Sequence, residues 1–167
     1  MSAKRKKRKN KKKARRGRSD FSGLRRKTEK SAQQLGGQTV WATGGQKMSE
    51  VIIDFAQPLL DQVYDDQAKK KILAFAVTAW NVALLPKDER AKLMEELIQS
   101  QKRLAGTREE KYLRAMLEML VERKRTHFAD ISRFVLDFEF VDMEDEFRFN
   151  VASTLQQPPD TSGRPKK

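Results

Sequence analysis

The chain has 167 residues, no cysteine and a formal net charge of +13. This length fits one domain with terminal extensions, and the lack of cysteine excludes disulfides, thiolate nucleophiles and cysteine-zinc sites. The charge is one-sided, because residues 1–30 hold 16 basic and 2 acidic side chains (+14), whereas residues 31–167 hold 20 basic and 21 acidic ones (−1). A polycationic segment therefore precedes a nearly neutral body.

The polycationic segment begins at the N-terminus, where twelve of the first 18 residues are Lys or Arg and none is acidic. Residues 1–30 are predicted to form a disordered arm, since the stretch from Met1 to Asp20 has no apolar side chains able to hold it together and its like charges repel, so it buries too little surface to fold. Phosphate backbones bind such arms by releasing condensed counterions, without reading base order. The candidate nucleic-acid-binding residues are Lys4, Arg5, Lys6, Lys7, Arg8, Lys9, Lys11, Lys12, Lys13, Arg15, Arg16 and Arg18.

The same basic run is compatible with three other roles. Such runs also serve as nuclear localisation signals, an anionic membrane surface attracts the same charges, and a solubilising tail needs no target. RNA is preferred over DNA because the sequence shows no element that reads a duplex. No apolar stretch follows the basic run, so the chain is expected to be non-secreted and cytoplasmic, or nuclear in a eukaryote.

Residues 31–47 are predicted to be a glycine-rich linker. Two glycine pairs, Gly36-Gly37 and Gly44-Gly45, flank a segment from Gln38 to Thr43 that is able to form a short strand. Trp41 within it is expected to dock on the folded body. The glycines lack the spacing of a phosphate-binding loop, so no nucleotide site is predicted.

Apolar periodicity predicts about four helices in a single globular domain over residues 48–155. The first begins near Ser49 and should be kinked or broken just before Pro58, which removes a backbone donor. The second runs from Asp65 or Asp66 to about Leu85 and is apolar nearly all round, so it should form the centre of the fold. Its most apolar part, residues 72–85, is too short to span a bilayer.

The third and fourth helices follow Pro86 and Thr107. Pro86 suits a first helical turn, and Gly106 is expected to stop the third helix. Thr107-x-x-Glu110 matches a capping box at the start of the fourth. That helix ends in Arg123, Lys124 and Arg125, a trio that either complements the helix dipole, which is the favoured interpretation, or extends the positive field of the arm.

The period then changes from that of a helix to that of a strand. Apolar residues alternate with polar ones over 134–141 and again over 147–151, which predicts an antiparallel β-hairpin with a four-residue loop. The predicted register pairs Val141 with Glu146 and Phe140 with Phe147, and its aromatic face should pack on the helices. Its edge is expected to pair with residues 39–43 or with a second copy of the protein. The tail, residues 156–167, contains three prolines and is predicted to be disordered.

Residues able to perform chemistry are few. A lone histidine, His127, is more often a surface residue than a base. The acidic run Asp142, Glu144, Asp145 and Glu146 lacks the spacing of a calcium loop. No catalytic, metal-binding or cofactor-binding residue is assigned, and a non-enzymatic protein is predicted.

The sequence therefore predicts a mainly α, α+β fold with a C-terminal antiparallel hairpin and a basic arm. The expected function is non-catalytic, electrostatic binding of RNA through the arm while the body contacts another protein. The alternative is a protein-interaction or homo-oligomeric adaptor domain, whose arm is only a localisation signal or a solubiliser.

Overall fold

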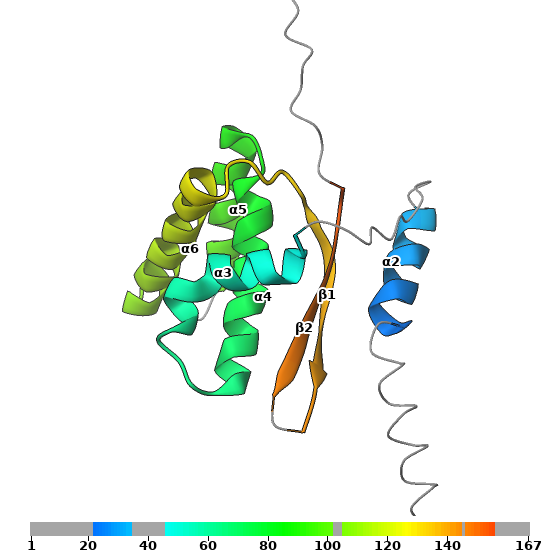
Figure 1. Ribbon diagram of the computed structural model, residues 1–167. Helices are drawn as coiled ribbons and strands as arrows, with labels where there is room; N and C mark the ends of the chain where they lie inside the picture. The colour runs from blue at the N-terminus through cyan, green and yellow to red at the C-terminus, as the bar shows by residue number, and fades with distance from the viewer. Residues whose placement is uncertain (1–21, 35–45, 102–104, 145, 156–167) are drawn as a thin grey trace, which may run out of the picture. The chain divides into compact units, whose positions relative to one another are not determined.

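The computed structural model describes residues 22–34, 46–101, 105–144 and 146–155 (Figure 1). Its elements in chain order are α2 (Ser22–Gln34), α3 (Met48–Leu60), α4 (Asp66–Ala83), α5 (Lys87–Ser100), α6 (Arg108–His127), β1 (Val135–Asp142) and β2 (Phe147–Ser153). The predicted mainly α, α+β fold with a C-terminal hairpin is confirmed. The predicted strand at 38–43, with Trp41, and the C-terminal tail lie outside the described residues.

The described chain divides into two compact units, and the single domain expected over residues 48–155 stays a prediction. The hairpin unit consists of α2 and residues 136–152, and the helical unit of residues 46–135 and 153–155, with the gaps given above. The chain passes between the units at three places, after residues 45, 135 and 152. The packing of the aromatic hairpin face on the helices stays a prediction.

The core of the helical unit is a triangle of aromatic rings from three elements. Phe55 of α3, Trp80 of α4 and Phe128 at the end of α6 meet edge to face, with ring centroids 5.2 to 5.8 Å apart. Phe55 and Trp80 are fully buried. Such pairs add about 0.5–1.5 kcal/mol each beyond the burial of their area, so the triangle fixes how α3, α4 and α6 cross.

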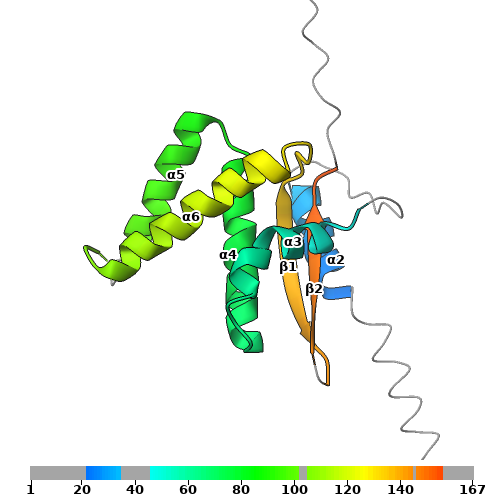
Figure 2. The same cartoon turned by 60° about the vertical axis from the view of Figure 1, so that its left-hand side comes forward.

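Helix α4 is central in the helical unit, as its all-round apolar sequence predicted. Its buried side chains are Leu73, Ala76, Val77, Ala79, Trp80, Val82 and Ala83. Asp65 caps its N-terminus by accepting a hydrogen bond from the Ala68 amide at 2.7 Å. Figure 2 shows α5 and α6 side by side as a helical hairpin, linked by a 2.9 Å bond from Arg114 Nη1 to Glu95 Oε2. That hydrogen bond lowers the pKa of Glu95.

The capping box predicted at the start of α6 is present. Thr107 Oγ1 accepts a hydrogen bond from the Glu110 amide at 3.3 Å. The Glu110 carboxylate accepts in return from the Gly106 amide at 2.6 Å. Gly106 has a φ of +74°, a left-handed conformation that other residues adopt at a cost. The connection between α5 and α6 therefore depends on this glycine.

The side chains of Trp80 and Asn81 hold the backbone at the start of the hairpin. Trp80 Nε1 donates to the Arg133 carbonyl at 2.8 Å. The neighbouring Asn81 carboxamide accepts from the Val135 amide at 2.9 Å and donates to the Val135 carbonyl at 2.8 Å. The Asn81 side chain thus makes the two hydrogen bonds to Val135 that a neighbouring strand would make. This pair joins α4 to the first residue of β1.

The Arg133 side chain gathers segments that lie far apart in the sequence. Its guanidinium donates to the Thr154 carbonyl at 3.0 Å, to Ser153 Oγ at 2.6 Å and to the Gln46 carbonyl at 3.2 Å. These residues lie where the chain leaves β2 and where it enters α3. The ends of the hairpin and the start of the helical unit are therefore held at one point.

Helix α3 continues through Pro58 to Leu60, so the predicted break does not occur. A proline inside a helix leaves the carbonyl four residues earlier without its backbone donor. That carbonyl belongs to Asp54, and it accepts a 3.2 Å hydrogen bond from Arg123 Nη2 of α6. Arg123 Nε donates to the next carbonyl, of Phe55, also at 3.2 Å. A neighbouring helix therefore supplies the donor that the proline lacks.

The hairpin forms where it was predicted, but its register differs by two residues. The Met143 amide donates to the Glu146 carbonyl at 2.7 Å, so the last residue of β1 faces the first residue of β2. Counting back along the strands places Phe140 opposite Phe149, whose rings stack at 5.2 Å. The predicted partner of Phe140 was Phe147. A shift of two keeps Phe138, Phe140, Phe147 and Phe149 on one face, and their rings contact one another. At the other end of β1 the face changes, since Val135 is 6% exposed and Leu136 is 56% exposed.

Strand β1 contains a β-bulge that the alternation pattern does not reveal. It has eight residues and β2 has seven. The Thr154 amide donates to the Phe134 carbonyl at 2.8 Å, so the far ends of the two strands also face each other. One residue of β1 is therefore extra. The Phe138 amide bonds to its neighbour's carboxylate, Asp137 Oδ1, at 2.8 Å, which places the irregularity at this pair.

Helix α2 was not predicted, because its residues fell in the segments assigned to the disordered arm and the linker. Among the α2 side chains whose burial is described, Leu24 is the one buried apolar residue, and charged residues fill most of the helix. Local interactions support it instead, including the i,i+4 pair of Arg25 and Glu29 at 3.0 Å. A Cβ on Gly23 would lie 3.2 Å from the Glu139 carboxylate, so glycine permits the close approach of α2 to β1.

Replacing Pro58 tests the compensation by Arg123. Pro58→Ala restores an amide donor to the Asp54 carbonyl, so it should raise the free energy of unfolding by up to about 3 kcal/mol. In the wild type, Arg123→Ala should lower the free energy of unfolding by about 1.5–3 kcal/mol. In the Pro58→Ala background this loss should be smaller by at least about 1 kcal/mol. Urea unfolding of the four proteins gives the coupling.

Arg125→Ala is the matched control, since Arg125 lies on the same helix and pairs only with Glu122 among the contacts described. Its effect should add to that of Pro58→Ala. If the effect of Arg123→Ala also added to that of Pro58→Ala, the compensation would be contradicted.

Candidate nucleic-acid interface

The twelve predicted phosphate-binding residues of the arm all lie at positions 4–18, outside the described residues. The described part of the candidate interface begins four residues after Arg18, at the start of α2.

Helix α2 continues the positive charge of the arm in an ordered form. Its charged residues are Arg25, Arg26, Lys27, Glu29 and Lys30, and its four cations are all exposed. Leu24 and Thr28 are buried, at 4% and 6% exposure. With 100° between successive residues, Arg26 and Lys30 lie on the face opposite to this buried pair. They are one turn apart and point to solvent together.

The buried edge of α2 includes a hydroxyl group. Thr28 Oγ1 donates to the Leu24 carbonyl at 2.9 Å, so the helix backbone satisfies this polar group. In the sequence Thr28 resembled an ordinary polar spacer after a basic run. One signal was available for α2, because no glycine or proline interrupts residues 24–35.

The second group of cations, at the end of α6, is mostly used inside the helical unit. Arg123 bonds to α3, and its guanidinium carbon lies 5.5 Å from the centroid of the Phe128 ring. Lys124 is only 3% exposed. Its Nζ lies 4.7 Å from the Trp80 ring and donates to the Phe128 carbonyl at 2.7 Å. Only Arg125 is exposed, in an ion pair with Glu122 at 3.0 Å.

A sequence signal for the burial of Lys124 existed. Leu117, Val121 and Lys124 follow one another at spacings of four and three, so the lysine continues the buried stripe of α6. Its cation lies over an aromatic ring and bonds to the last turn, which the helix dipole also favours. Arg123, Lys124 and Arg125 therefore do not form a basic surface that extends the positive field of the arm.

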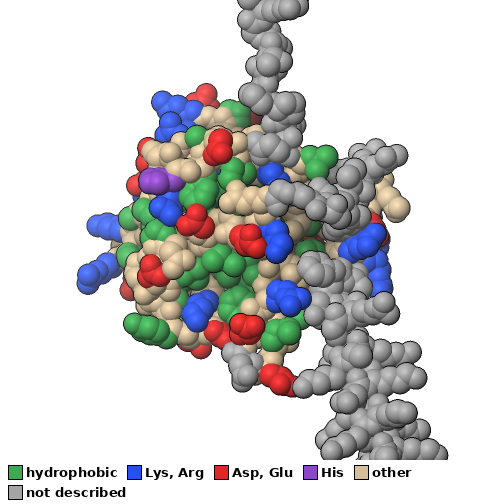
Figure 3. Space-filling model, viewed as in Figure 1, with side chains coloured by type: hydrophobic (Ala, Val, Ile, Leu, Met, Phe, Trp, Pro, Cys, Tyr) green, Lys and Arg blue, Asp and Glu red, His purple; other side chains and the backbone are tan. Residues whose placement is uncertain are grey.

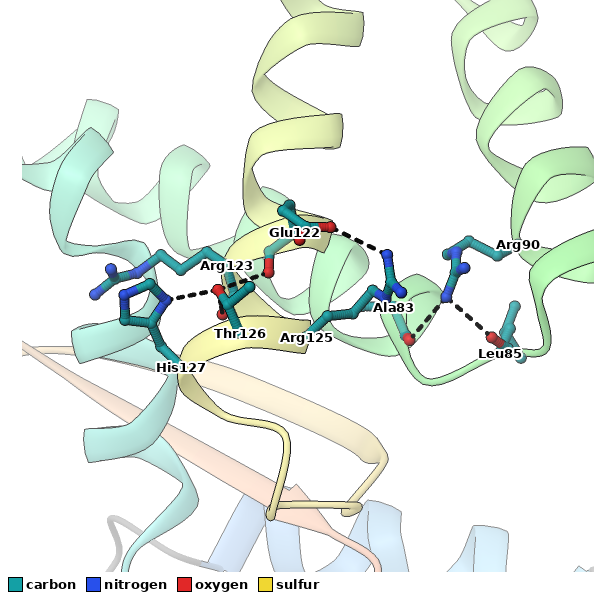
Figure 4. A network of polar contacts seen from close by, with 8 residues as sticks. All are labelled: Ala83, Leu85, Arg90, Glu122, Arg123, Arg125, Thr126 and His127. Carbon is teal, nitrogen blue, oxygen red and sulfur yellow. Dashed lines mark hydrogen bonds and ion pairs between the residues drawn. The ribbon is translucent and has the colours of Figure 1, made fainter.

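His127 lies next to a hydroxyl group rather than a carboxylate. Its Nδ1 is 2.7 Å from Thr126 Oγ1, and this hydroxyl also donates to the Glu122 carbonyl at 2.9 Å (Figure 4). The same figure shows Arg90 bonding to the Ala83 and Leu85 carbonyls, at the C-terminal end of α4. These contacts close helix ends, and no catalytic role is assigned to them.

The acidic residues of the hairpin turn are exposed where they are described. Asp142, Glu144 and Glu146 point to solvent, and Asp145 lies outside the described residues. Across the described part of the chain no group of three His, Asp or Glu side chains is placed to hold a metal ion. Over the face shown in Figure 3, acidic and basic side chains are interspersed among apolar ones, as the near-neutral charge of residues 31–167 requires.

Comparison with known proteins gives no relative. No family model, no curated protein and no solved structure matches the chain. Among the described residues, no helix combines the length and the apolar character needed to cross a membrane.

Lys124 carries the clearest electrostatic signature in the described chain. Burial lowers the pKa of its ammonium group from the ordinary value of 10.5, and the nearby Asp130 opposes this effect. The unfolded chain therefore holds this proton to a higher pH than the folded chain does. Between the two pKa values the free energy of unfolding must rise with pH.

Lys124→Met removes this titration while it keeps much of the side-chain volume. The wild type should become more stable relative to Lys124→Met as the pH rises toward 10.5, because the penalty for the buried charge disappears. Thermal or urea unfolding at several pH values measures the difference. Lys111→Met, at an exposed position of the same helix, is the control. A difference that falls with pH would contradict the assignment.

Proposed function

We propose that this is a small non-catalytic protein that holds RNA through phosphate contacts made by its N-terminal arm and by the outer face of α2. The observation that carries the proposal is the distribution of charge, with +14 on residues 1–30 and −1 on the rest. A charge density of this kind favours polyanions through counterion release. The described cations that follow the arm, on α2, lie on an exposed helix face.

The arm and α2 contribute to binding in different ways. Within the arm, lysines attract phosphates as compact charges, whereas Arg15, Arg16 and Arg18 also stack on unpaired bases. Arg26 and Lys30 on α2 are held about 5–6 Å apart at Cβ by the helix. Less entropy is lost when these two side chains bind, so α2 fixes the direction in which the strand leaves the arm.

RNA is proposed over DNA because single-stranded and looped RNA offers both phosphates and splayed bases to an arginine-rich segment. A cytoplasmic location, or a nuclear one in a eukaryote, is part of the same proposal. The helical unit supplies no chemistry in this proposal and serves to contact another protein. Its aromatic core and its hydrogen bonds to Val135 make it a rigid support.

A second function is supported by the sheet. It has only two strands within the described chain, so each strand has one edge without a strand neighbour, and such edges accept strands from partners. In this alternative the protein is an adaptor or a homo-oligomer, and the arm is a localisation signal or a solubiliser. RNA affinity would then be unaffected by removal of the arm.

Deletion of residues 1–18 tests the primary proposal. If about six phosphates are neutralised, the affinity of the intact chain for single-stranded RNA should fall roughly 300-fold between 50 and 200 mM salt. The deleted protein should bind weakly at both salt concentrations. Filter binding or gel-shift titration measures both effects. Equal affinity of the two proteins, or affinity independent of salt, would exclude the arm as the binding element.

The contribution of α2 is tested by Arg26→Gln with Lys30→Gln in the intact chain. If both side chains contact phosphates, the slope of log K against log salt should become shallower by roughly 1.4, at about 0.7 per phosphate of a single strand. The matched control is Lys71→Gln with Lys111→Gln, two exposed lysines of the helical unit. Equal slopes for both double variants would restrict the interface to the arm.

A further inference from the structure

Helix α6 presents a second apolar stripe to solvent, opposite to its buried face. Tyr112 is 58% exposed and Met119 is 37% exposed, and the exposed Ala115 lies between them. The three follow one another at spacings of three and four, which is the a and d pattern of a helix that pairs with another helix. A surface helix normally has polar residues on the face opposite to the core.

Charged residues continue the same stripe at both ends. Arg108 lies seven residues before Ala115, and Glu122 lies seven residues after it. At 1.5 Å per residue both are about 10.5 Å from the alanine along the axis. Beside the stripe, Lys111 precedes Ala115 and Glu118 follows it. This face is therefore basic toward its N-terminal end and acidic toward its C-terminal end.

Such a face is complementary to itself when two copies run antiparallel. A two-fold axis at Ala115 places Arg108 opposite the partner's Glu122 and Lys111 beside the partner's Glu118, and the symmetry repeats each pair. Tyr112 then packs on the partner's Met119, and the small alanine lets the helices approach closely. A parallel arrangement would place like charges together. Two-fold contacts of one patch with itself are the commonest form of homo-oligomer.

We propose that this stripe on α6 is the contact surface of a homodimer whose two helices pack antiparallel across Ala115. The exposed pair of Glu122 with Arg125 exchanges for the contact with Arg108 of the second copy. One helix pair is a small interface, so dimerisation is expected in the micromolar range. The dimer carries two basic arms, which raises its avidity for a polyanion without any new contact.

The dimer is tested by sedimentation velocity of the full chain at about 1 to 200 µM, at about 100 mM salt and free of nucleic acid. Arg108→Glu and Glu122→Arg should each weaken association by about 10-fold or more, since each places like charges opposite each other. The double variant reverses both partners and should restore association to within about three-fold of the wild type. Both positions, Arg108 and Glu122, are on the helix surface, and circular dichroism verifies that each variant is folded.

Three results would overturn the proposal. A wild type that stays monomeric at every concentration excludes the dimer. A dimer that is insensitive to both single substitutions uses another surface, such as the hairpin edge. Weakening without recovery in the double variant excludes the antiparallel pairing. Because no RNA is present, the result does not depend on whether the arm binds RNA.

Discussion

The burial of Trp80 is the constraint on which the rest of the helical unit depends. Its ring contacts Phe55 and Phe128 edge to face, and Lys124 covers it with a cation. Its indole N–H is satisfied by the Arg133 carbonyl, so a large side chain with one polar atom is buried without an unpaired donor. The next residue, Asn81, pairs with the start of β1. Two consecutive residues of α4 therefore position both the helix crossings and the root of the hairpin.

Helices α3 to α6 and the hairpin followed from periodicity because their apolar patterns are strong, and Asp65 and Thr107 cap α4 and α6. Periodicity did not fix which side of α4 is buried, since a helix that is apolar all round has no single apolar face. Leu73 is buried, whereas Ile72 and Phe75 are only partly buried. The hairpin register was wrong because a turn closed by Met143 and Glu146, and a bulge near Asp137, leave the alternation of side chains almost unchanged. Helix α2 was missed because charged side chains, rather than an apolar stripe, make up most of it.

The candidate interface likewise has one part that the sequence predicts and another part that it does not. The arm was evident from charge alone, and its residues need no fold to be recognised. The orientation of a cation on a folded body is set by packing, which composition does not encode. Arg123 and Lys124 have the same sequence context as Arg125, yet they turn toward Phe55 and Trp80 while Arg125 stays in solvent. An account of nucleic-acid binding that counted all three as surface charge would overestimate the basic area of the body. The cations of α2, in contrast, are exposed and do count as surface charge.

The contacts of Arg133 also determine how mechanical load travels through the molecule. Force applied to the basic segment reaches the helical unit at Gln46, and force applied to the hairpin reaches it at Val135 and Ser153. The guanidinium of Arg133 holds the first and the last of these points, and Asn81, close to the Arg133 backbone, holds the other. Force applied at any of these points would thus be shared among several hydrogen bonds around Arg133 and Asn81. Because Gln46 precedes α3, force from the N-terminal side meets the Arg133 hydrogen bond before it reaches that helix.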